Sequence, residues 1–387
     1  KIETDWRRPA PRYRFLPMNR RDALTGILIV SPATAFAFQA NSKINVGIIG
    51  TGNRGRYDGT IFSRDSRIQV SALCDLYPDQ IDAAKTEIPS ADKAKVYTKH
   101  QDLLADSSID AVQITTPVYL HPEHFEAAVE ARKHIYCEKP AGASVAGVKR
   151  LLAAAARADK AKHIQFGFQQ RYSPEYLAAE QIMRAGRLGD LVLMRSHWMV
   201  GGVQPPSRMR PIPQERQDRM WYPWRAKSGD MIVEQDCHGV DVLNWYSGRH
   251  PVSATGDGGR KLRSFGDTLD HLNVTYDYGQ GLHGFLHACQ LAQAWSQVDE
   301  QFFGTDGTLE THRKYYRWSP LGRAQVQVDS KREITIDAIQ RFVTHIVENK
   351  PENNAQSAAE STFTSLLGRM AIDAGRRVTW EELLQSE

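Results

Sequence analysis

The sequence predicts an α/β fold of two domains, and three observations support it. Apolar runs of strand length alternate with helical segments from Lys43 to about residue 165, and a glycine-rich turn follows the first run. Beyond residue 166, segments such as DHLNVTYDYGQG and EQFFGTDGTLET are typical of antiparallel strands joined by glycine turns. The predicted domains are residues 43–165, with a parallel sheet and right-handed crossovers, and residues 166–387, an α+β domain.

Composition favours a small-molecule ligand over a nucleic acid or a membrane. The 387 residues, 41% of them apolar and 24% charged, are enough for two domains with a large core. The 49 Lys and Arg residues against 45 Asp and Glu residues leave a net charge of +4, and the basic residues are scattered along the chain. The four cysteines lie far apart without Cys-x-x-Cys spacing, so neither a metal site nor a disulfide framework is expected.

Residues 1–42 precede the first predicted strand and are expected to be an upstream extension with an export signal. Arg20 and Arg21 stand before a short apolar run and an Ala-Phe-Ala pattern at residues 35–37, which is typical of a twin-arginine signal. The run is too short for a permanent membrane span, and an amphipathic surface helix is the alternative. We expect a mature protein that begins near Phe38 and is periplasmic or otherwise exported, or cytoplasmic if the signal does not function.

The first strand and its turn predict a dinucleotide-binding domain. The segment KINVGIIGTGNRG places Gly50, Gly52 and Gly55 directly after an apolar, β-branched run. The first glycine allows a tight turn, the second lets a pyrophosphate approach the backbone, and the third lets the next helix pack close to the strand. The N-terminus of that helix then faces the phosphates. A surface turn is the alternative, but the strand before the glycines favours a Rossmann domain.

An acidic residue at the end of the second strand strengthens this prediction. IQVSALCD ends at Asp75, twenty positions after Gly55, which is the spacing for a carboxylate on the adenosine ribose hydroxyls. A 2′-phosphate would meet its negative charge, so NAD is expected and NADP is disfavoured. Between the glycines, Asn53 and Arg54 are expected near the phosphates, and a solvated arginine is the alternative for Arg54.

Two further strand ends should face the same ligand. SIDAVQITTP is a third strand, HPEHFEAAVEAR a helix and HIYCEKP a fourth strand, and ligands of parallel sheets bind beyond the carboxyl ends of the strands. Lys139 follows the fourth strand, where an ordinary surface lysine is the alternative. The residues expected at the cofactor from this part of the chain are Thr115, Thr116, Pro117, His121, Glu138 and Lys139.

A second polar group lies about a hundred residues further along. In GDMIVEQDCHGVDVLNWYSG, Glu234, His238 and Asp241 fall at positions i, i+4 and i+7, so a continuous helix would present them on one face. A metal site, a proton relay and a structural network are all compatible with this pattern. Metal is disfavoured because no further His or Cys stands at ligand spacing.

Taken in order, the motifs GIIGTGNRG, CD, TTPVYLHPEH, YCEKPAG and EQDCHGVDVLNW resemble those of the glucose-fructose oxidoreductase / inositol dehydrogenase family, Gfo/Idh/MocA. The resemblance implies a nicotinamide cofactor in the first domain, oxidation or reduction of sugars, inositols or related polyols, and a second domain whose open, mostly antiparallel sheet supports a homodimer or homotetramer. Lys139 matches the family's Glu-Lys-Pro lysine and His238 its helix histidine. Glu234 and Asp236 stand where the family commonly has Asp and Gly, so a substrate inferred from other members is in doubt.

The chemistry of alcohol oxidation fits these residues. A hydride leaves carbon toward the nicotinamide while a base takes the hydroxyl proton, and a histidine suits that proton transfer. We expect His238 to exchange the proton, Lys139 to stabilise the alkoxide and Glu234 to orient the pair, while Asp241 braces the helix. The residues expected to contact the substrate, with simple packing as the alternative, are Gln169, Arg171, Tyr172, Trp224 and Asp236.

Two other functions remain open from the sequence. One is an NAD-dependent glycosidase or lyase that acts through transient oxidation of a sugar, and the other is a non-catalytic NAD or sugar sensor. The presence of Lys139 and His238 disfavours the sensor. An export signal favours a tightly bound cofactor, because twin-arginine export carries folded proteins and free NAD is scarce outside the cytoplasm.

Overall fold

The computed structural model describes residues 43–201, 219–263, 265–290 and 296–386. Residues 43–387 form one compact unit of their own. The proposed export signal, including Arg20, Arg21 and the predicted start near Phe38, lies outside the described residues. Among the described helices, none is both long and apolar enough to cross a bilayer.

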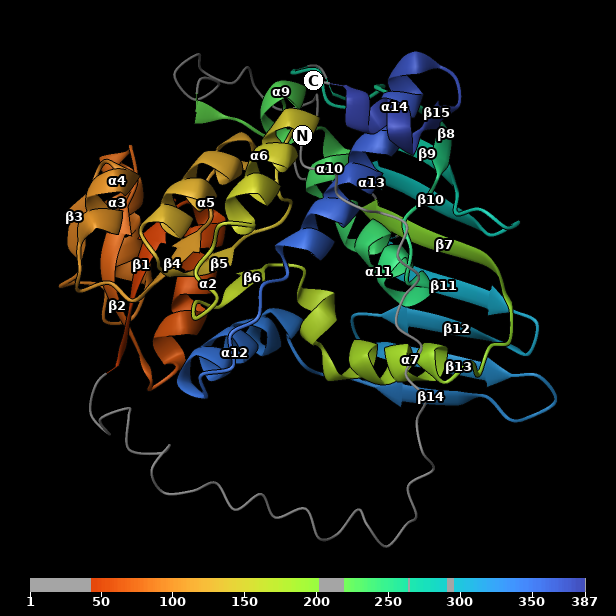
Figure 1. Ribbon diagram of the computed structural model, residues 1–387, viewed down its shortest axis with the longest axis horizontal. Coiled ribbons are helices and arrows are strands. Elements are labelled where there is room, and N and C mark those ends of the chain that lie inside the picture. The colour runs from red at the N-terminus through yellow and green to blue at the C-terminus, as the bar shows by residue number, and fades with distance from the viewer. Residues whose placement is uncertain (1–42, 202–218, 264, 291–295, 387) are drawn as a thin grey trace, which may run out of the picture. The chain divides into compact units, whose positions relative to one another are not determined.

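The first sheet is the predicted parallel one. Its six strands run in the order β3-β2-β1-β4-β5-β6, so the chain moves outward from β1 in both directions (Figure 1). The apolar run before Gly50 forms β1, which is buried on both faces as its β-branched composition predicts. Such a reversal of strand order places a ligand crevice beyond the carboxyl end of β1. The strands are β1 (Ile44–Ile49), β2 (Ile68–Cys74), β3 (Lys95–Tyr97), β4 (Ala111–Ile114), β5 (His134–Cys137) and β6 (Ile164–Phe166).

Helices connect these strands, and one helix from late in the chain joins them. The connecting elements are α2 (Asn53–Arg64), α3 (Pro78–Glu87), α4 (His100–Ala105), η2 (Val118–Leu120), α5 (His121–Glu130) and α6 (Val145–Ala155). The late helix is α12 (Ile334–Val347), whose Phe342 meets Phe62 and Tyr136 edge-on, with ring centroids 5.9 and 5.6 Å apart. This contact buries an aromatic cluster that the local sequence pattern does not reveal.

The second sheet has nine strands in the order β14-β13-β12-β11-β7-β10-β9-β8-β15, and all pairs are antiparallel except β7 with β10. This confirms the α/β fold with an open, mostly antiparallel second sheet. Its strands are β7 (Leu191–Val200), β8 (Ser253–Gly259), β9 (His271–Asp277), β10 (His283–Gln290), β11 (Gln297–Gly304), β12 (Gly307–His312), β13 (Tyr315–Pro320), β14 (Val326–Asp329) and β15 (Val378–Thr379).

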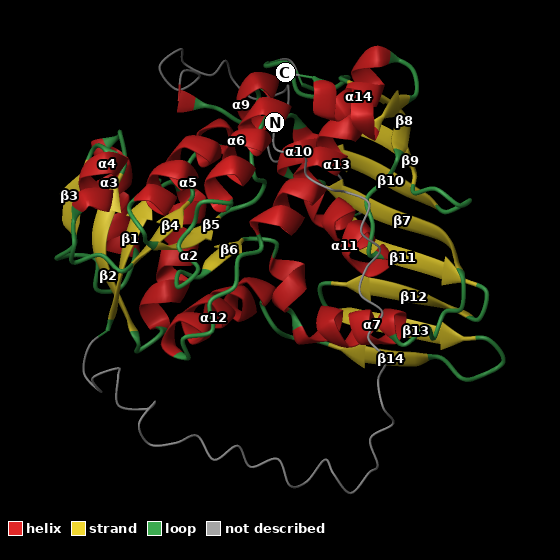
Figure 2. Ribbon diagram, in the orientation of Figure 1, coloured by secondary structure: helices red, strands yellow, loops and turns green. Residues whose placement is uncertain are grey.

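Helices pack on the side of this sheet that faces the first domain (Figure 2). They are α7 (Pro174–Arg184), α11 (Cys237–Ser247) and α13 (Ala355–Ala374). Alternate residues of β7, such as Met194 and Trp198, are buried beneath them, while Arg195 and His197 point to the other face and are half-buried. The shorter elements are η3 (Gln169–Tyr172), α9 (Arg225–Ser228), α10 (Met231–Glu234) and α14 (Trp380–Gln385).

Candidate active site

The glycine turn has the geometry that a dinucleotide requires. Gly50 has φ of +90°, and a Cβ there would lie 2.7 Å from the backbone nitrogen of Thr116. A Cβ on Gly55 would lie 2.0 Å from the carbonyl oxygen of Gly50, so this helix can approach the strand only with glycine. A Cβ on Gly52 would meet nothing within 4 Å. Gly52, the residue just before α2, therefore leaves open space where a pyrophosphate can approach the backbone.

A cavity of about 450 Å³, called the Gly50 cavity below, opens at this turn. Its volume lies in the usual range for small-molecule sites. It brings together half of the residues expected at the cofactor, and it adds Arg219, Trp221 and Lys227 from the second domain. The expected residues in its wall are Gly50, Gly52, Asp75, Thr115, Thr116 and Pro117.

Asp75 is fixed in the wall of the cavity by the turn itself. One carboxylate oxygen accepts hydrogen bonds from the backbone N–H of Thr51 at 2.8 Å and from its hydroxyl at 3.2 Å, and the other accepts from the N–H of Tyr77 at 3.0 Å. Three donors stabilise the carboxylate at the carboxyl end of β2. Thr51 was not singled out by the sequence analysis, although it stands between the first two glycines.

Arg54 contacts two carboxylates of the first domain. Its guanidinium pairs with Glu138 at 2.7 Å and with Asp58 at 3.1 Å, and it donates to the side chain of Gln169 at 3.3 Å. Burial raises the pKa of Asp58 well above its usual range, despite the opposing charge of Arg54. Arg54 thus holds Glu138 beside Lys139 while 35% of its side-chain surface stays exposed, and its place near the phosphates stays a prediction.

Three more residues expected at the cofactor do not line the Gly50 cavity and make contacts within the protein. Each ring nitrogen of His121 lies 2.8 Å from a carbonyl oxygen, that of Pro140 or that of Thr116, so this buried ring joins the Glu-Lys-Pro turn to the Thr-Thr-Pro turn. The side chain of Asn53 accepts from Arg56 at 2.8 Å. Glu138 is buried under Gly167, where a Cβ would lie 2.4 Å from its carboxylate oxygen. Gly167 was missed because its requirement depends on a side chain 29 positions away.

Lys139 meets the second domain through Glu234. Its Nζ donates to the Glu234 carbonyl oxygen at 2.6 Å and lies 3.1 Å from the Glu234 carboxylate, and the exposed fraction of each side chain is 11%. Burial by itself lowers the pKa of Lys139, but Glu234, with smaller contributions from Cys237 and Glu138, more than offsets burial, and the net result is a raised pKa. Lys139 is therefore a cation fixed where the two domains meet.

His238 is buried with an unused hydrogen-bonding atom. Its ring stacks on Trp198, with centroids 5.4 Å apart and planes 12° apart, and meets the edge of Phe168 at 6.0 Å. Among the described residues, nothing hydrogen-bonds its Nδ1. Burial, together with the positive charge of Lys139, lowers the pKa of His238 well below its usual range. The imidazole is therefore neutral and a weaker base than an exposed histidine, and a neutral imidazole can accept a proton from a hydroxyl.

The expectation of one helix face for Glu234, His238 and Asp241 is wrong. Glu234 ends α10 and His238 lies in the first turn of α11, so the chain turns between them at Gln235 and Asp236. The break lets Glu234 point to Lys139. Asp241 has the bracing role expected for it, since it accepts a bidentate pair of bonds from Arg171 and a bond from the hydroxyl of Ser361.

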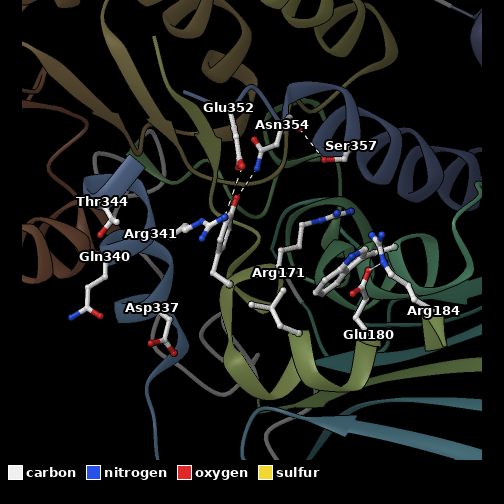
Figure 3. A pocket seen from close by; sticks show the side chains of 13 residues that line it. Arg171, Glu180, Arg184, Asp337, Gln340, Arg341, Thr344, Glu352, Asn354 and Ser357 are labelled. Atoms are coloured by element: carbon white, nitrogen blue, oxygen red, sulfur yellow. Dashed lines mark hydrogen bonds and ion pairs between the residues drawn. The ribbon is translucent and has the colours of Figure 1, made fainter. Parts of the chain in front are cut away.

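The residues expected at the substrate do not form one group. Arg171 and Tyr172 line a second cavity, between η3, α7, α11 and α12, that contains neither Lys139 nor His238 (Figure 3). Gln169 accepts from Arg54, and Trp224 packs edge-on against Phe265 at 5.3 Å. A neighbouring tryptophan, Trp221, reaches the Gly50 cavity instead.

Asp236 stands apart from these residues. It is fully buried, and no described residue hydrogen-bonds either of its carboxylate oxygens. Burial, together with the negative charges of Asp230 and Glu234, raises its pKa well above the usual range. Burial and these charges therefore favour the protonated form of the carboxyl group, whose O–H can donate a hydrogen bond.

Comparison with known proteins decides the family. Residues 44–166 match the model of the family described as "Oxidoreductase family, NAD-binding Rossmann fold", and residues 176–310 match that of the "GFO/IDH/MocA C-terminal domain". The chain belongs to the Gfo/Idh/MocA family. The Rossmann match covers β1 to β6 and the whole glycine turn, and the second match covers Glu234 and His238.

Three relatives of the chain illustrate how far the similarity to individual proteins extends. An inositol 2-dehydrogenase of Salmonella typhimurium is 26% identical over 202 residues, so the chain spans about half the length of this curated relative, 52% of each protein. The scyllo-inositol dehydrogenase of Lactobacillus casei with NAD(H) and scyllo-inositol superposes with a TM-score of 0.71 at 21% identity, covering 88% of this chain and all of that one. Levoglucosan dehydrogenase with NADH and levoglucosan gives 0.75 at 16% identity, covering 87% and 99%. At such identities the two structures establish the fold alone.

Proposed function

We propose that this protein is an NAD-dependent oxidoreductase that interconverts a secondary alcohol and a carbonyl on a sugar, inositol or related polyol. The observation that carries the proposal is the chemistry of Lys139 and His238. A fixed cation at the carboxyl edge of the first sheet and a neutral, buried imidazole with a free nitrogen are the two groups that alcohol oxidation requires.

The Gly50 cavity fits the dinucleotide. Gly52 leaves the backbone open to a pyrophosphate, and Asp75 offers a carboxylate to ribose hydroxyls while opposing a 2′-phosphate. Bound NAD supplies the acceptor for the hydride. Arg219, which pairs with Asp79 on α3 at 2.9 Å and lies 4.2 Å from the centroid of the Tyr77 ring, reaches from the second domain across to this cavity. Such a crossing contact supports slow exchange of the cofactor.

The protein's own groups divide the proton chemistry. His238 takes the hydroxyl proton, since its imidazole is neutral and its Nδ1 has no hydrogen-bond partner among the described residues. Lys139 donates a hydrogen bond to the oxygen as its negative charge develops, and Glu234 keeps that ammonium charged and in place. In the reverse direction the same groups return the proton to the carbonyl oxygen.

The substrate class follows from the family and its relatives, which include inositol 2-dehydrogenases and a levoglucosan dehydrogenase. Asp236 distinguishes this chain from the common family pattern, because an extra acid lies two positions before His238. When its carboxyl group is protonated, Asp236 can donate a hydrogen bond inside the protein, which the glycine that the family commonly has at this position cannot do.

Assembly and location complete the proposal. The sheet face away from the helices carries half-buried apolar and polar side chains on β7, β10 and β11, such as Leu193, Phe285 and Phe303, and such a face suits a second copy of the chain. We propose a homodimer or homotetramer built on this face.

We also propose export through Arg20 and Arg21, with the cofactor already bound.

One experiment tests the central proposal. The purified protein is assayed for co-purified NAD(H), then incubated with a panel of inositols, hexoses and glycosides while both reduced cofactor and bond cleavage are measured. We expect accumulation of reduced cofactor with a polyol or sugar when NAD is in excess. Bond cleavage without net reduction would instead establish transient oxidation, and cofactor binding without any turnover across the panel would favour a sensor.

A further inference from the structure

Three potential metal ligands meet in the wall of the Gly50 cavity. His100 is the first residue of α4, and Glu123 and His124 lie in the first turn of α5. One ligand atom from each residue lies within 4.8 Å of the other two, and all three residues line the cavity. The chain brings them together from two different connections of the first sheet, 23 positions apart, so sequence spacing gives no sign of the cluster.

The orientation of His124 fits metal binding. Its Nδ1 lies 3.0 Å from the hydroxyl oxygen of Thr116, which fixes the ring and leaves Nε2 as the free nitrogen. Metal-bound histidines commonly hold their other ring nitrogen in such a bond. The His100 ring lies 4.2 Å from that of His124, centroid to centroid, at a tilt of 52°. Two imidazole rings lie this close either because they pack against each other or because both bind the same ion.

The ligand set selects the kind of ion. Two imidazoles and one carboxylate suit Zn²⁺ and its transition-metal neighbours, whereas Mg²⁺ and Ca²⁺ prefer oxygen ligands. Ligand atoms around zinc lie roughly 3.3 Å apart, given bonds of about 2.0 to 2.1 Å in a tetrahedron. In the structure the three ligand atoms lie within 4.8 Å of one another. Rotation of the partly exposed side chains of His100 and Glu123 can bring them to the shorter zinc distance, while His124 stays bonded to Thr116.

We propose that His100, Glu123 and His124 form a binding site for Zn²⁺ or a similar transition-metal ion in the cofactor-free protein. Three protein ligands leave a fourth position for water or another ligand, as in other sites with two histidines and one glutamate. Because the ligands belong to the wall of the Gly50 cavity, the ion would compete with the dinucleotide for this cavity. Zinc therefore inhibits loading of the cofactor, and this second part rests on the proposed NAD binding.

Direct titration tests the site without reference to activity. The full chain is freed of nucleotide and metal, and Zn²⁺ binding is measured by calorimetry, with Co²⁺ as a spectroscopic probe of nitrogen and oxygen ligands. We expect one saturable site per chain. His100→Ala and Glu123→Gln should each weaken it by about tenfold or more, since each removes a ligand, and both positions are partly exposed, so the fold should tolerate the change.

A matched control uses His283→Ala, an exposed histidine on β10 that does not line the cavity. It should bind zinc as the unaltered protein does. The proposal would be overturned if the unaltered protein has no saturable zinc site. It would also be overturned if His100→Ala and Glu123→Gln bind zinc as tightly as the unaltered protein does. In a second titration, zinc should raise the apparent Kd for NAD in the unaltered protein but not in His100→Ala. An unchanged Kd would overturn the proposed competition between zinc and NAD. The same titration measures NAD binding by itself, so failure of NAD binding would be seen separately.

Discussion

Lys139 and Glu234, 95 positions apart, join the two domains through a pair of contacts from one ammonium group, 2.6 Å to the Glu234 carbonyl oxygen and 3.1 Å to its carboxylate. Both side chains are largely buried, so this charge pair is screened little by solvent. The contact with the carbonyl oxygen fixes where the ammonium lies, and the contact with the carboxylate keeps it charged.

The first prediction concerns that charge. Glu234→Gln removes the negative group that raises the pKa of Lys139, so the ammonium should lose its proton at a lower pH. The high-pH limb of the kcat profile should therefore move to lower pH, with turnover reduced about tenfold or more at its optimum. Glu234→Asp is the matched control, since it keeps the charge and restores the residue common in the family. An unmoved high-pH limb in Glu234→Gln would show that Lys139 does not govern it.

Asp75 should set the choice of cofactor. Replacing it with serine removes the charge that opposes a 2′-phosphate and should narrow or reverse the preference for NAD over NADP by at least about 1 kcal/mol, the typical net contribution of one hydrogen bond. Calorimetric Kd values for both dinucleotides measure the effect. Asp82→Ser, on the exposed side of α3, should leave the ratio unchanged. Tighter NADP than NAD binding by the unaltered protein would contradict the assignment.

The local sequence was sufficient to predict helices, strands and the glycine turn, but not to predict which side chains contact one another. The glycine spacing predicted the turn before α2, and the apolar runs predicted β1, β2, β4 and β5, because these features depend on a few neighbouring residues. Arg54 shows the limit. Whether a guanidinium meets a phosphate or a carboxylate depends on Glu138, 84 positions away, and the sequence does not show that Glu138 is buried next to it.

Helix periodicity misled at one point for a related reason. The spacing of Glu234, His238 and Asp241 is that of one helix face, but tertiary contacts override the period. Glu234 pairs with Lys139 of the first domain, whereas Asp241 pairs with Arg171, so the two acids have different partners. The chain breaks its helix at Asp236 between them.

The docking of α12 on the first domain predicts a large effect on stability. Phe342 is fully buried against Phe62 and Tyr136, so Phe342→Ala removes a ring and leaves a cavity. The free energy of unfolding should fall by about 3 to 5 kcal/mol. Denaturant titration measures it, with Gln340→Ala, at an exposed position on the same helix, as the control. A loss below about 1 kcal/mol would mean that the site collapses around the smaller side chain.

The export prediction is tested at Arg20 and Arg21. Replacing Arg20 and Arg21 with lysine keeps the charge but removes the twin-arginine pair, so a longer precursor should accumulate in the cytoplasm. Fractionation and N-terminal sequencing follow the change, and the unaltered chain should begin near Phe38 in the exported fraction. An unchanged distribution between compartments would exclude this signal.

The last prediction concerns Lys139 and His238 together. If both act on one substrate oxygen, Lys139→Ala and His238→Ala should each lower turnover by about two or more orders of magnitude, the usual scale for acid-base and electrostatic groups. NAD binding should survive in both, because neither residue lines the Gly50 cavity.

The pH profile and the double variant separate this mechanism from a structural role. Because burial lowers the pKa of His238, the unaltered enzyme should keep its activity as the pH falls below about 6.5, the usual histidine value, and lose it only where His238 gains a proton. The double variant should be little worse than the worse single variant, since two groups that serve one transition state fail as a unit. If the loss of turnover in the double variant equals the product of the two single losses, Lys139 and His238 have independent roles. Near-normal turnover of His238→Ala with cofactor bound would assign the proton to another base.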